Sequence, residues 1–218
     1  MNFRCNREAD PSAAAIANAA PKVIPQRVAW LIFAGFFLFL GSSSLFAGEP
    51  TDLLRVAAEK GIQILHDPSL KSKKEERIAR LREIAYSLFD FTEMARRSLG
   101  PHWRRLTPEE QREFTSAFRD FLEKTYADKI DSYRSERAVF TREVMDRDFV
   151  EVYSKLINDK GDEFSVAYKL HRKEENWKIY DVVFENLSVV NNYRSQFQRI
   201  LAKSSFAELM QMIRKKAD

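Results

Sequence analysis

Between residues 51 and 133, apolar residues recur at steps of three or four positions, with charged residues between them. This spacing places the apolar side chains on one face of an α-helix. The pattern predicts helices over residues 51–66, 72–88, 90–99 and 108–133.

The predicted helix starts carry recognisable caps. Thr51 is a candidate cap of the first helix. A capping box, in which a cap side chain and an acid three residues later satisfy each other's amides, opens each of the other three. The boxes are Ser72 with Glu75, Asp90 with Glu93, and Thr107 with Glu110. Pro108 suits a first helical position because it has no N–H to satisfy, and Gly100 favours a left-handed helix end.

The predicted helix over residues 108–133 has an unusually aromatic face. Its members share one side of the helix and are Phe114, Phe118, Leu122, Tyr126, Ile130 and Tyr133. Such a stripe is most often ordinary core. No reactive residue type accompanies it, however, and a wide apolar surface without chemistry also suits a container for an apolar ligand.

After residue 137 the period changes from helical to alternating, which indicates strands. Strands are predicted over residues 138–144, 149–157, 164–170 and 177–184, followed by helices over 188–201 and 206–213. The strand 177–184 carries apolar residues on both faces, so both of its faces are expected to be covered. Helices, then an antiparallel meander, then helices again indicate an α+β fold in one domain over residues 48–218.

Residues 1–47 have the layout of a secretory signal peptide. Lys22 and Arg27 precede an uncharged apolar run of twelve residues, 29–40, and small residues follow up to Ala47 and Gly48. Twelve residues are too few to cross a bilayer core of about 30 Å unaided. The alternative is an uncleaved anchor that extends through residues 42–47. The signal peptide predicts secretion to the periplasm.

Charge and cysteine content exclude several classes of protein. The net charge is +4 over 218 residues, and residues 1–47 supply +2 of it, so the remainder carries only +2 with acids and bases interspersed. A nucleic-acid binder would show a clustered basic stripe, so no nucleic acid is expected as a partner. The terminal Arg214, Lys215 and Lys216 are interpreted as a solvated end. Cys5 is the only cysteine and lies in the leader, which excludes a disulfide, a thiolate nucleophile or a cysteine metal site beyond it.

No catalytic, cofactor or metal motif is present. His66, His102 and His171 lack metal-ligand spacing, and neither a nucleophile elbow nor a phosphate-binding glycine loop occurs. Asp181 lies in the predicted strand 177–184, where a buried acid needs hydrogen-bond partners. It is interpreted as a structural acid, and the alternative is a general base with His102 as its acid. The prediction is therefore no enzyme, no metal and no cofactor.

Two long blocks and a shorter one between them resemble the MlaC family, the periplasmic phospholipid-binding components of the Mla (Ttg2, toluene-tolerance) ABC transport system. The blocks span residues 88–114, 118–126 and 176–197, and the likeness extends from about residue 52 to 213. One departure is Asn186, which stands where the family commonly has glycine. Another is the turn 203–206, where the family is commonly glycine-rich.

The resemblance implies an NTF2-like fold, in which a curved antiparallel sheet of four to five strands is covered by helices and encloses a deep apolar pocket. Family members hold the acyl tails of a glycerophospholipid as cargo inside, leave the headgroup near solvent, and have no catalytic residues. They exchange lipid with an outer-membrane lipoprotein complex and with an inner-membrane ABC transporter that carries an MCE-type ring.

On this basis we expect a set of aromatic and aliphatic residues to line the tail pocket. They are Phe114, Phe118, Leu122, Tyr126, Val152, Val166, Tyr168, Val182, Phe184, Tyr193 and Phe197. Arg104, Arg105 and Arg134 are candidate rim charges for protein partners. Alternatives are a carrier of another amphiphile such as a hopanoid, an NTF2-like enzyme on an apolar substrate, and a structural adaptor with a filled core.

Overall fold

Helices and strands follow one another in the predicted order in the computed structural model, which describes residues 49–131, 137–157 and 161–217. The predicted leader, Tyr133 and Arg134 lie outside the described residues. The first helices are α3 (Glu49–His66), α4 (Lys74–Leu88), α5 (Phe91–Leu99) and α6 (Pro108–Asp131), with short 3-10 helices η2 (Pro68–Leu70) and η3 (Gly100–Arg105) between them. The strands β1 (Arg137–Asp146), β2 (Phe149–Ile157), β3 (Glu163–Lys173), β4 (Asn176–Phe184) and β5 (Leu187–Ser188) precede α7 (Val189–Leu201) and α8 (Phe206–Ala217).

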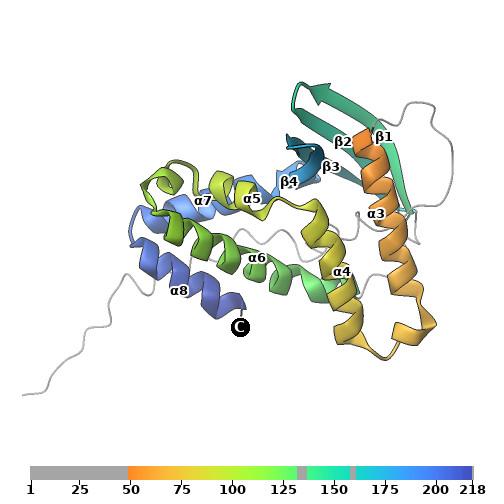
Figure 1. The fold of residues 1–218 in the computed structure, drawn as a ribbon, viewed down its shortest axis with the longest axis horizontal. Coiled ribbons are helices and arrows are strands. Elements are labelled where there is room, and N and C mark those ends of the chain that lie inside the picture. Colours follow the sequence, from red (N-terminus) through yellow and green to blue (C-terminus); the bar gives the residue numbers. More distant parts are fainter. Residues whose placement is uncertain (1–48, 132–136, 158–160, 218) are drawn as a thin grey trace, which may run out of the picture.

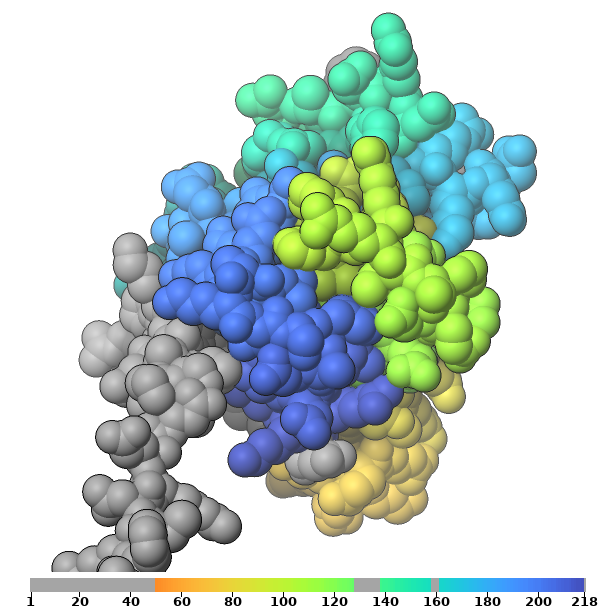
Figure 2. Space-filling model, turned by 90° about the vertical axis from the view of Figure 1, so that its left-hand side faces the viewer, coloured from red at the N-terminus to blue at the C-terminus, as the bar shows by residue number. Residues whose placement is uncertain are grey.

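The five strands form one antiparallel sheet in the order β1-β2-β3-β4-β5. In Figure 1 α3 crosses the sheet, and α5, α6, α7 and α8 lie together at the other end of the molecule. Figure 2 views that end directly, where α7 and α8 lie beside the segment from α5 to α6. The predicted α+β fold with an antiparallel sheet covered by helices is confirmed.

Several predicted caps are confirmed by their hydrogen bonds. The Thr107 amide donates to Glu110 Oε2 at 2.7 Å, and the Glu110 amide donates to Thr107 Oγ1 at 3.2 Å. Asp90 caps α5 by accepting from the Glu93 amide at 3.0 Å, and α5 ends at Gly100 with a φ of 57°. These helix boundaries follow from local chemistry.

Two predicted caps are wrong. Helix α3 begins at Glu49, and the amide and hydroxyl of Thr51 donate instead to Glu143 Oε2 on β1, at 3.1 and 2.5 Å. Helix α4 begins at Lys74 with no side-chain cap. The buried Arg77 guanidinium holds that turn by donating to the Leu70 carbonyl at 2.5 Å. At Thr51 a tertiary contact has replaced the local one, and at the start of α4 a bond within the η2–α4 segment holds the turn.

Strand β4 contains a bulge that shifts its alternation by one residue, so that Ile179, Val182 and Phe184 share the inner face of the sheet. Lys169 pairs with Asp181 and Leu170 with Ile179, so Tyr180 is an extra residue on β4. Asp181 and Val182 are therefore both buried although they point to opposite sides of the sheet. The expected covering of both β4 faces is confirmed.

The turn that leads from β4 to β5 holds Glu185 and Asn186 at positive φ, 44° and 65°. This is the backbone region that glycine adopts without strain and that asparagine tolerates better than most residues. The absence of glycine at position 186 therefore leaves the junction intact.

Candidate functional site

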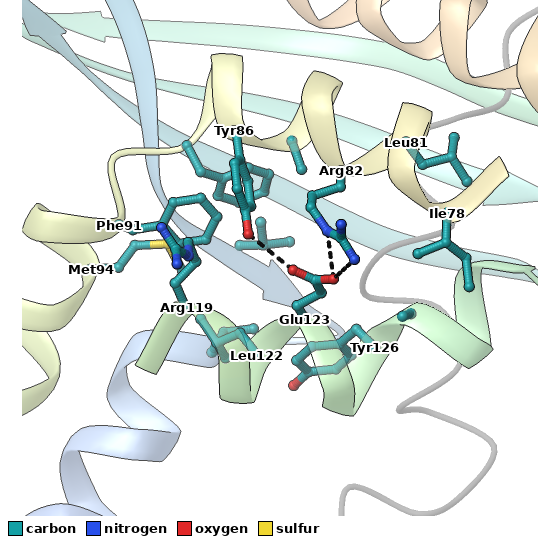
Figure 3. Close-up of a pocket in the computed structure, with 15 residues that line it drawn as sticks. Ile78, Leu81, Arg82, Tyr86, Phe91, Met94, Arg119, Leu122, Glu123 and Tyr126 are labelled. Carbon is teal, nitrogen blue, oxygen red and sulfur yellow. Dashed lines mark hydrogen bonds and ion pairs between the residues drawn. The ribbon is translucent and has the colours of Figure 1, made fainter. Parts of the chain in front are cut away.

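An apolar cavity of about 60 Å³ lies where α4, α5 and α6 meet β4 and the start of α7. Figure 3 shows it between α4 and α6. Its apolar lining residues are Ile78, Leu81, Ala85, Phe89, Phe91, Met94, Leu122, Tyr126, Ala127, Val182 and Val189.

The cavity arises because two helices meet through small side chains. On α4, Leu81 and Ala85 are four residues apart and share one face, and on α6 the cavity side carries Leu122 and Ala127. Alanine fills much less of the space between two helix axes than the rings on the rest of α6. The wall opposite the helices is completed by Val182 of β4.

The mouth of the cavity is closed by four polar side chains, Arg82 and Tyr86 from α4 and Arg119 and Glu123 from α6, which we call the α4–α6 latch (Figure 3). Arg82 Nε donates to Glu123 Oε1 at 2.6 Å, and the Tyr86 hydroxyl donates to Glu123 Oε2 at 3.0 Å. The Arg119 guanidinium lies 5.1 Å from the centre of the Tyr86 ring, within cation–π range.

The charges of the latch shift its ionisable groups away from their ordinary values. The hydrogen bond to Glu123 raises the pKa of Arg82. Burial and the nearby Glu123 carboxylate raise the pKa of Tyr86. Arg82 is thus a permanent cation and Tyr86 a neutral hydrogen-bond donor at the edge of an apolar cavity.

Two wider grooves, lined by charged as well as apolar residues, flank the latch. One, of about 800 Å³, shares Tyr86, Phe89, Phe91 and Arg119 with the cavity. Its other charged lining residues are Asp90, Arg112, Lys173, Glu174 and Lys178. The second, of about 750 Å³, shares Arg82, Tyr86 and Glu123 with the cavity. The latch therefore separates an apolar interior from solvent-filled grooves.

The eleven residues expected to line a tail pocket occupy three different places. Leu122, Tyr126 and Val182 line the cavity. Val152, Val166, Tyr168 and Phe184 are fully buried on the inner face of the sheet, away from the cavity lining. On that face Val152 pairs with Tyr168 and Val166 with Phe184.

The other four, Phe114, Phe118, Tyr193 and Phe197, pack against one another between α6 and α7. The Phe118 ring centre lies 5.4 Å from that of Tyr193 and 5.6 Å from that of Phe197, both edge-to-face. The Phe114 ring stacks on Phe118 at 5.7 Å and meets the edge of Phe197 at 5.7 Å. This arrangement is close aromatic packing.

Most of the residues that line the cavity were not predicted as site residues from the sequence. The sequence predicts only an apolar helix face that contains Ile78, Leu81 and Ala85. It gives no signal for the four latch residues, Arg82, Tyr86, Arg119 and Glu123. The available signal was the pairing of bulky and small apolar residues, Leu81 with Ala85 and Leu122 with Ala127, on two helices predicted to be neighbours.

Asp181 has the structural role favoured from the sequence. Its carboxylate accepts from the Ser188 hydroxyl at 2.6 Å and from the Val190 amide at 3.0 Å, at the N-terminus of α7. Burial raises the pKa of Asp181. His102 lies in η3, and neither residue lines the cavity, so the structure does not bring this acid–base pair together at the apolar site.

The remaining candidate charges lie on the surface. Arg104 and Arg105 are exposed residues of η3, and Arg214 pairs with Glu113 at 3.1 Å. No group of His, Cys, Asp and Glu in the described residues is placed to hold a metal ion. Among these residues no helix combines the length and the apolar character needed to cross a bilayer.

The fold and the cavity define an α+β protein whose helices leave an apolar space beside a five-stranded antiparallel sheet. The family described as MlaC protein matches residues 55–215, well over half of the sequence. The chain belongs to the MlaC family, which confirms the resemblance found in the sequence.

A solved structure shares this fold. It is described as the phospholipid-binding protein from Ralstonia solanacearum in complex with a phospholipid, and it superposes with a TM-score of 0.68. The identity is 22%, and the match covers 76% of this chain and 95% of the other. The comparison with curated proteins gives no match.

Proposed function

We propose that this protein is a periplasmic carrier that binds the acyl tails of a glycerophospholipid in the apolar space between α4 and α6. The observation that carries the proposal is the cavity, whose lining is apolar apart from the latch at its mouth. Membership of the MlaC family supports it, as does the phospholipid-binding protein that shares the fold.

The free energies are consistent with a carrier. At about 0.8 kcal/mol per buried methylene, two chains of about sixteen carbons represent on the order of 25 kcal/mol of transfer from water. An apolar interior of comparable extent is needed to carry such a lipid across an aqueous space. Few strong contacts should hold the lipid, since it must be handed on.

Binding on this scale requires the helices to move apart. A methylene occupies about the volume of a water molecule, about 30 Å³, so two tails need roughly 1000 Å³. The cavity of about 60 Å³ holds only a small part of that volume. We propose that α4 is the wall that moves, because the latch joins it to α6 through one partly exposed ion pair, Arg82 with Glu123, which is worth about 0–1 kcal/mol.

We further propose a place for this carrier between two membranes. The signal-peptide pattern of residues 1–47 and the family favour the periplasm. The partners implied by the family are an outer-membrane lipoprotein complex and an inner-membrane Mla ABC transporter with an MCE-type ring, between which the carrier would shuttle lipid.

The first experiment identifies the cargo. The protein is purified from the periplasm, extracted with organic solvent, and its lipids are analysed by mass spectrometry. We expect glycerophospholipid in a fixed ratio to protein. A hopanoid or another amphiphile at that ratio would redirect the proposal to a different cargo, and a lipid-free protein would contradict it.

A second experiment tests the location of the tails. Ala85→Trp places an indole in the cavity and should abolish co-purifying phospholipid while the far-UV circular dichroism and the cooperativity of thermal unfolding stay unchanged. Ala207→Trp, at an exposed position of α8, is the matched control and should retain the lipid. Wild-type lipid content in Ala85→Trp would place the tails elsewhere.

A further inference from the structure

The α4–α6 latch contains more cationic and donor groups than a simple helix–helix tie needs. One carboxylate, Glu123, accepts from Arg82 at 2.6 Å and from Tyr86 at 3.0 Å, and the Arg119 guanidinium lies against the Tyr86 ring. Both guanidiniums flank Tyr86 at the cavity mouth in Figure 3. A guanidinium pair with a phenol donor is a typical set of groups for binding an oxyanion.

Arg82 donates through the edge of its guanidinium that can hold two oxygens of one anion, and here a single oxygen occupies that edge. Its Nε and a terminal nitrogen both contact the same Glu123 oxygen, so the guanidinium presents its side edge. A phosphodiester offers two unesterified oxygens and a single negative charge, as Glu123 does. It could replace this carboxylate at Arg82 and Tyr86 without changing the net charge of the cluster.

The exchange is feasible because the latch is open to solvent. The side chains of Arg82 and Glu123 are 41% and 25% exposed, and Tyr86 is 39% exposed. Ion pairs at this exposure are weak, so an incoming anion with good geometry can compete for the guanidinium. The neighbouring groove of about 800 Å³ gives room for a headgroup beside Arg119.

The position of the cluster relative to the cavity specifies the ligand further. An anion bound at Arg82 lies at the boundary between the two flanking grooves and the apolar lining formed by Leu81, Ala85 and Leu122. A ligand that fills both sides has a negatively charged group joined to hydrocarbon. Inorganic phosphate satisfies only the first half of that requirement.

We propose that Arg82, Tyr86 and Arg119 bind the phosphodiester of a glycerophospholipid in place of the Glu123 carboxylate. This inference rests on the proposed carrier function. When the phosphodiester takes these donors, Glu123 no longer ties α4 to α6, so headgroup binding releases the helix that must move to admit the tails. Glu123 thus occupies the headgroup site in the closed form.

Arg82 is the principal ligand of this site and Arg119 the secondary one. Arg119 also contacts Asp120 Oδ1, with its Nε at 2.9 Å and a terminal nitrogen at 2.8 Å. The acids that face the cluster are therefore Glu123 and Asp120, and Lys124 lines the same groove. A phosphomonoester carries a second negative charge, which the Glu123 and Asp120 carboxylates would repel. The site therefore favours a phosphodiester over a phosphomonoester.

The test compares two lipids with the same chains, one with and one without a phosphodiester headgroup. Short-chain phosphatidylglycerol and diacylglycerol with identical chains are titrated into delipidated protein, and Kd is measured for each. We expect the wild type to prefer phosphatidylglycerol by about tenfold. In Arg82→Gln/Arg119→Gln the ratio of the two Kd values should fall to about twofold or less, a change of the size expected for losing charge-assisted bonds, whatever the common effect of the opened latch on tail binding.

Control variants distinguish a specific contact of Arg82 with the phosphodiester from a general effect of positive charge on α4. Arg80→Gln removes an arginine of α4 that pairs with Glu76 and does not line the cavity, and should keep the wild-type preference. Arg82→Lys keeps the positive charge but lacks the planar guanidinium, so it should retain only part of the preference for phosphatidylglycerol. Glu123→Gln should tighten phosphatidylglycerol binding by about threefold because a competing anion is removed.

The outcomes that overturn the proposals are distinct. An unchanged preference in Arg82→Gln/Arg119→Gln, or weaker phosphatidylglycerol binding in Glu123→Gln, would overturn the headgroup site and leave the carrier function standing. Inorganic phosphate that binds as tightly as phosphatidylglycerol would identify a free-anion site instead. Failure of wild-type protein to bind either lipid would overturn the carrier function itself.

Discussion

Helix α6 has two apolar sides with opposite kinds of packing. Toward α7, Phe114 and Phe118 interlock with Tyr193 and Phe197, and we call this the packed seam. Toward α4, Leu122 and Ala127 border the cavity, and we call this the hollow seam. Tyr126 joins the two, since its ring lines the cavity and its hydroxyl is hydrogen-bonded to that of Tyr193.

The difference shows that burial alone does not identify a ligand site. Phe118 and Leu122 are both buried, at 0% and 3% exposure, and both belong to the same stripe of the sequence. Phe118 is surrounded by rings that fill the space around it, whereas Leu122 faces a gap left by alanines. A site for hydrocarbon is found where apolar side chains lack partners of the right volume.

The largest expected effect is on the packed seam. Phe118→Ala should lower the free energy of unfolding by about 3–5 kcal/mol, because it leaves a ring-sized void among side chains that cannot collapse. Leu122→Ala, four residues along the same helix, should cost only about 2 kcal/mol, since this side chain already has fewer neighbours. Urea unfolding of the two variants measures the contrast, and equal losses would mean that the two seams are packed alike.

An intermediate effect is expected at Asp90, which holds the junction between the walls formed by α4 and α5. Its carboxylate accepts from Lys173 Nζ at 2.8 Å and lies 3.2 Å from His171 Nε2. Burial alone would raise its pKa, but the Lys173 ammonium, the Glu93 amide and His171 outweigh burial and lower the pKa. Asp90→Asn keeps the cap and should cost about 1–2 kcal/mol at neutral pH, because one surface lysine and one imidazole lose their partner.

The sign of the pH dependence follows from that shift. A depressed pKa in the folded state stabilises the protein above the unfolded value of 3.8, and this contribution is lost as the pH falls through the folded pKa. The wild type and Asp90→Asn should therefore differ by a constant amount near neutral pH and converge in acid below pH 3.8. Urea unfolding at a series of pH values checks this, and a difference that grows in acid would contradict the assigned shift.

The smallest effect is expected from the latch of the hollow seam. Glu123→Gln should change the free energy of unfolding by less than about 1 kcal/mol, because the ion pair with Arg82 is partly exposed. A loss comparable to that of Phe118→Ala would show that the latch is part of the core and cannot yield to a ligand. Thermal and urea unfolding of the purified variant give the value.

Local sequence signals were sufficient for most element boundaries. The Thr107–Glu110 box, the Asp90 cap and the alternation of β2 and β3 each depend on residues a few positions apart, so the chain carries them without reference to the fold. The failures at Thr51 and Ser72 differ in cause. At Thr51 the acceptor of the amide is Glu143, which comes from β1. At Ser72 helix α4 begins two residues later without a side-chain cap, and Arg77 of α4 ties its first turns to the Leu70 carbonyl of η2.

The candidate site was predicted only in outline. An apolar stripe on α6 was visible, yet Phe114 and Leu122 look alike in a sequence because both recur at helical spacing. Their roles differ only in the folded protein, where Phe114 packs against a ring of α7 and Leu122 faces an alanine of α4 across the cavity. The latch could not be predicted from the sequence either, because Arg82 and Glu123 are 41 positions apart and meet only in the folded protein.

The sequence by itself determined the α+β order of elements, the absence of cysteine after Cys5, and the family, because these depend on local period and residue identity. The tertiary structure decided which apolar residues enclose a cavity and which close it. That outcome depends on the volumes of side chains brought together from α4, α6 and β4, and volume complementarity exists only between elements that have already met.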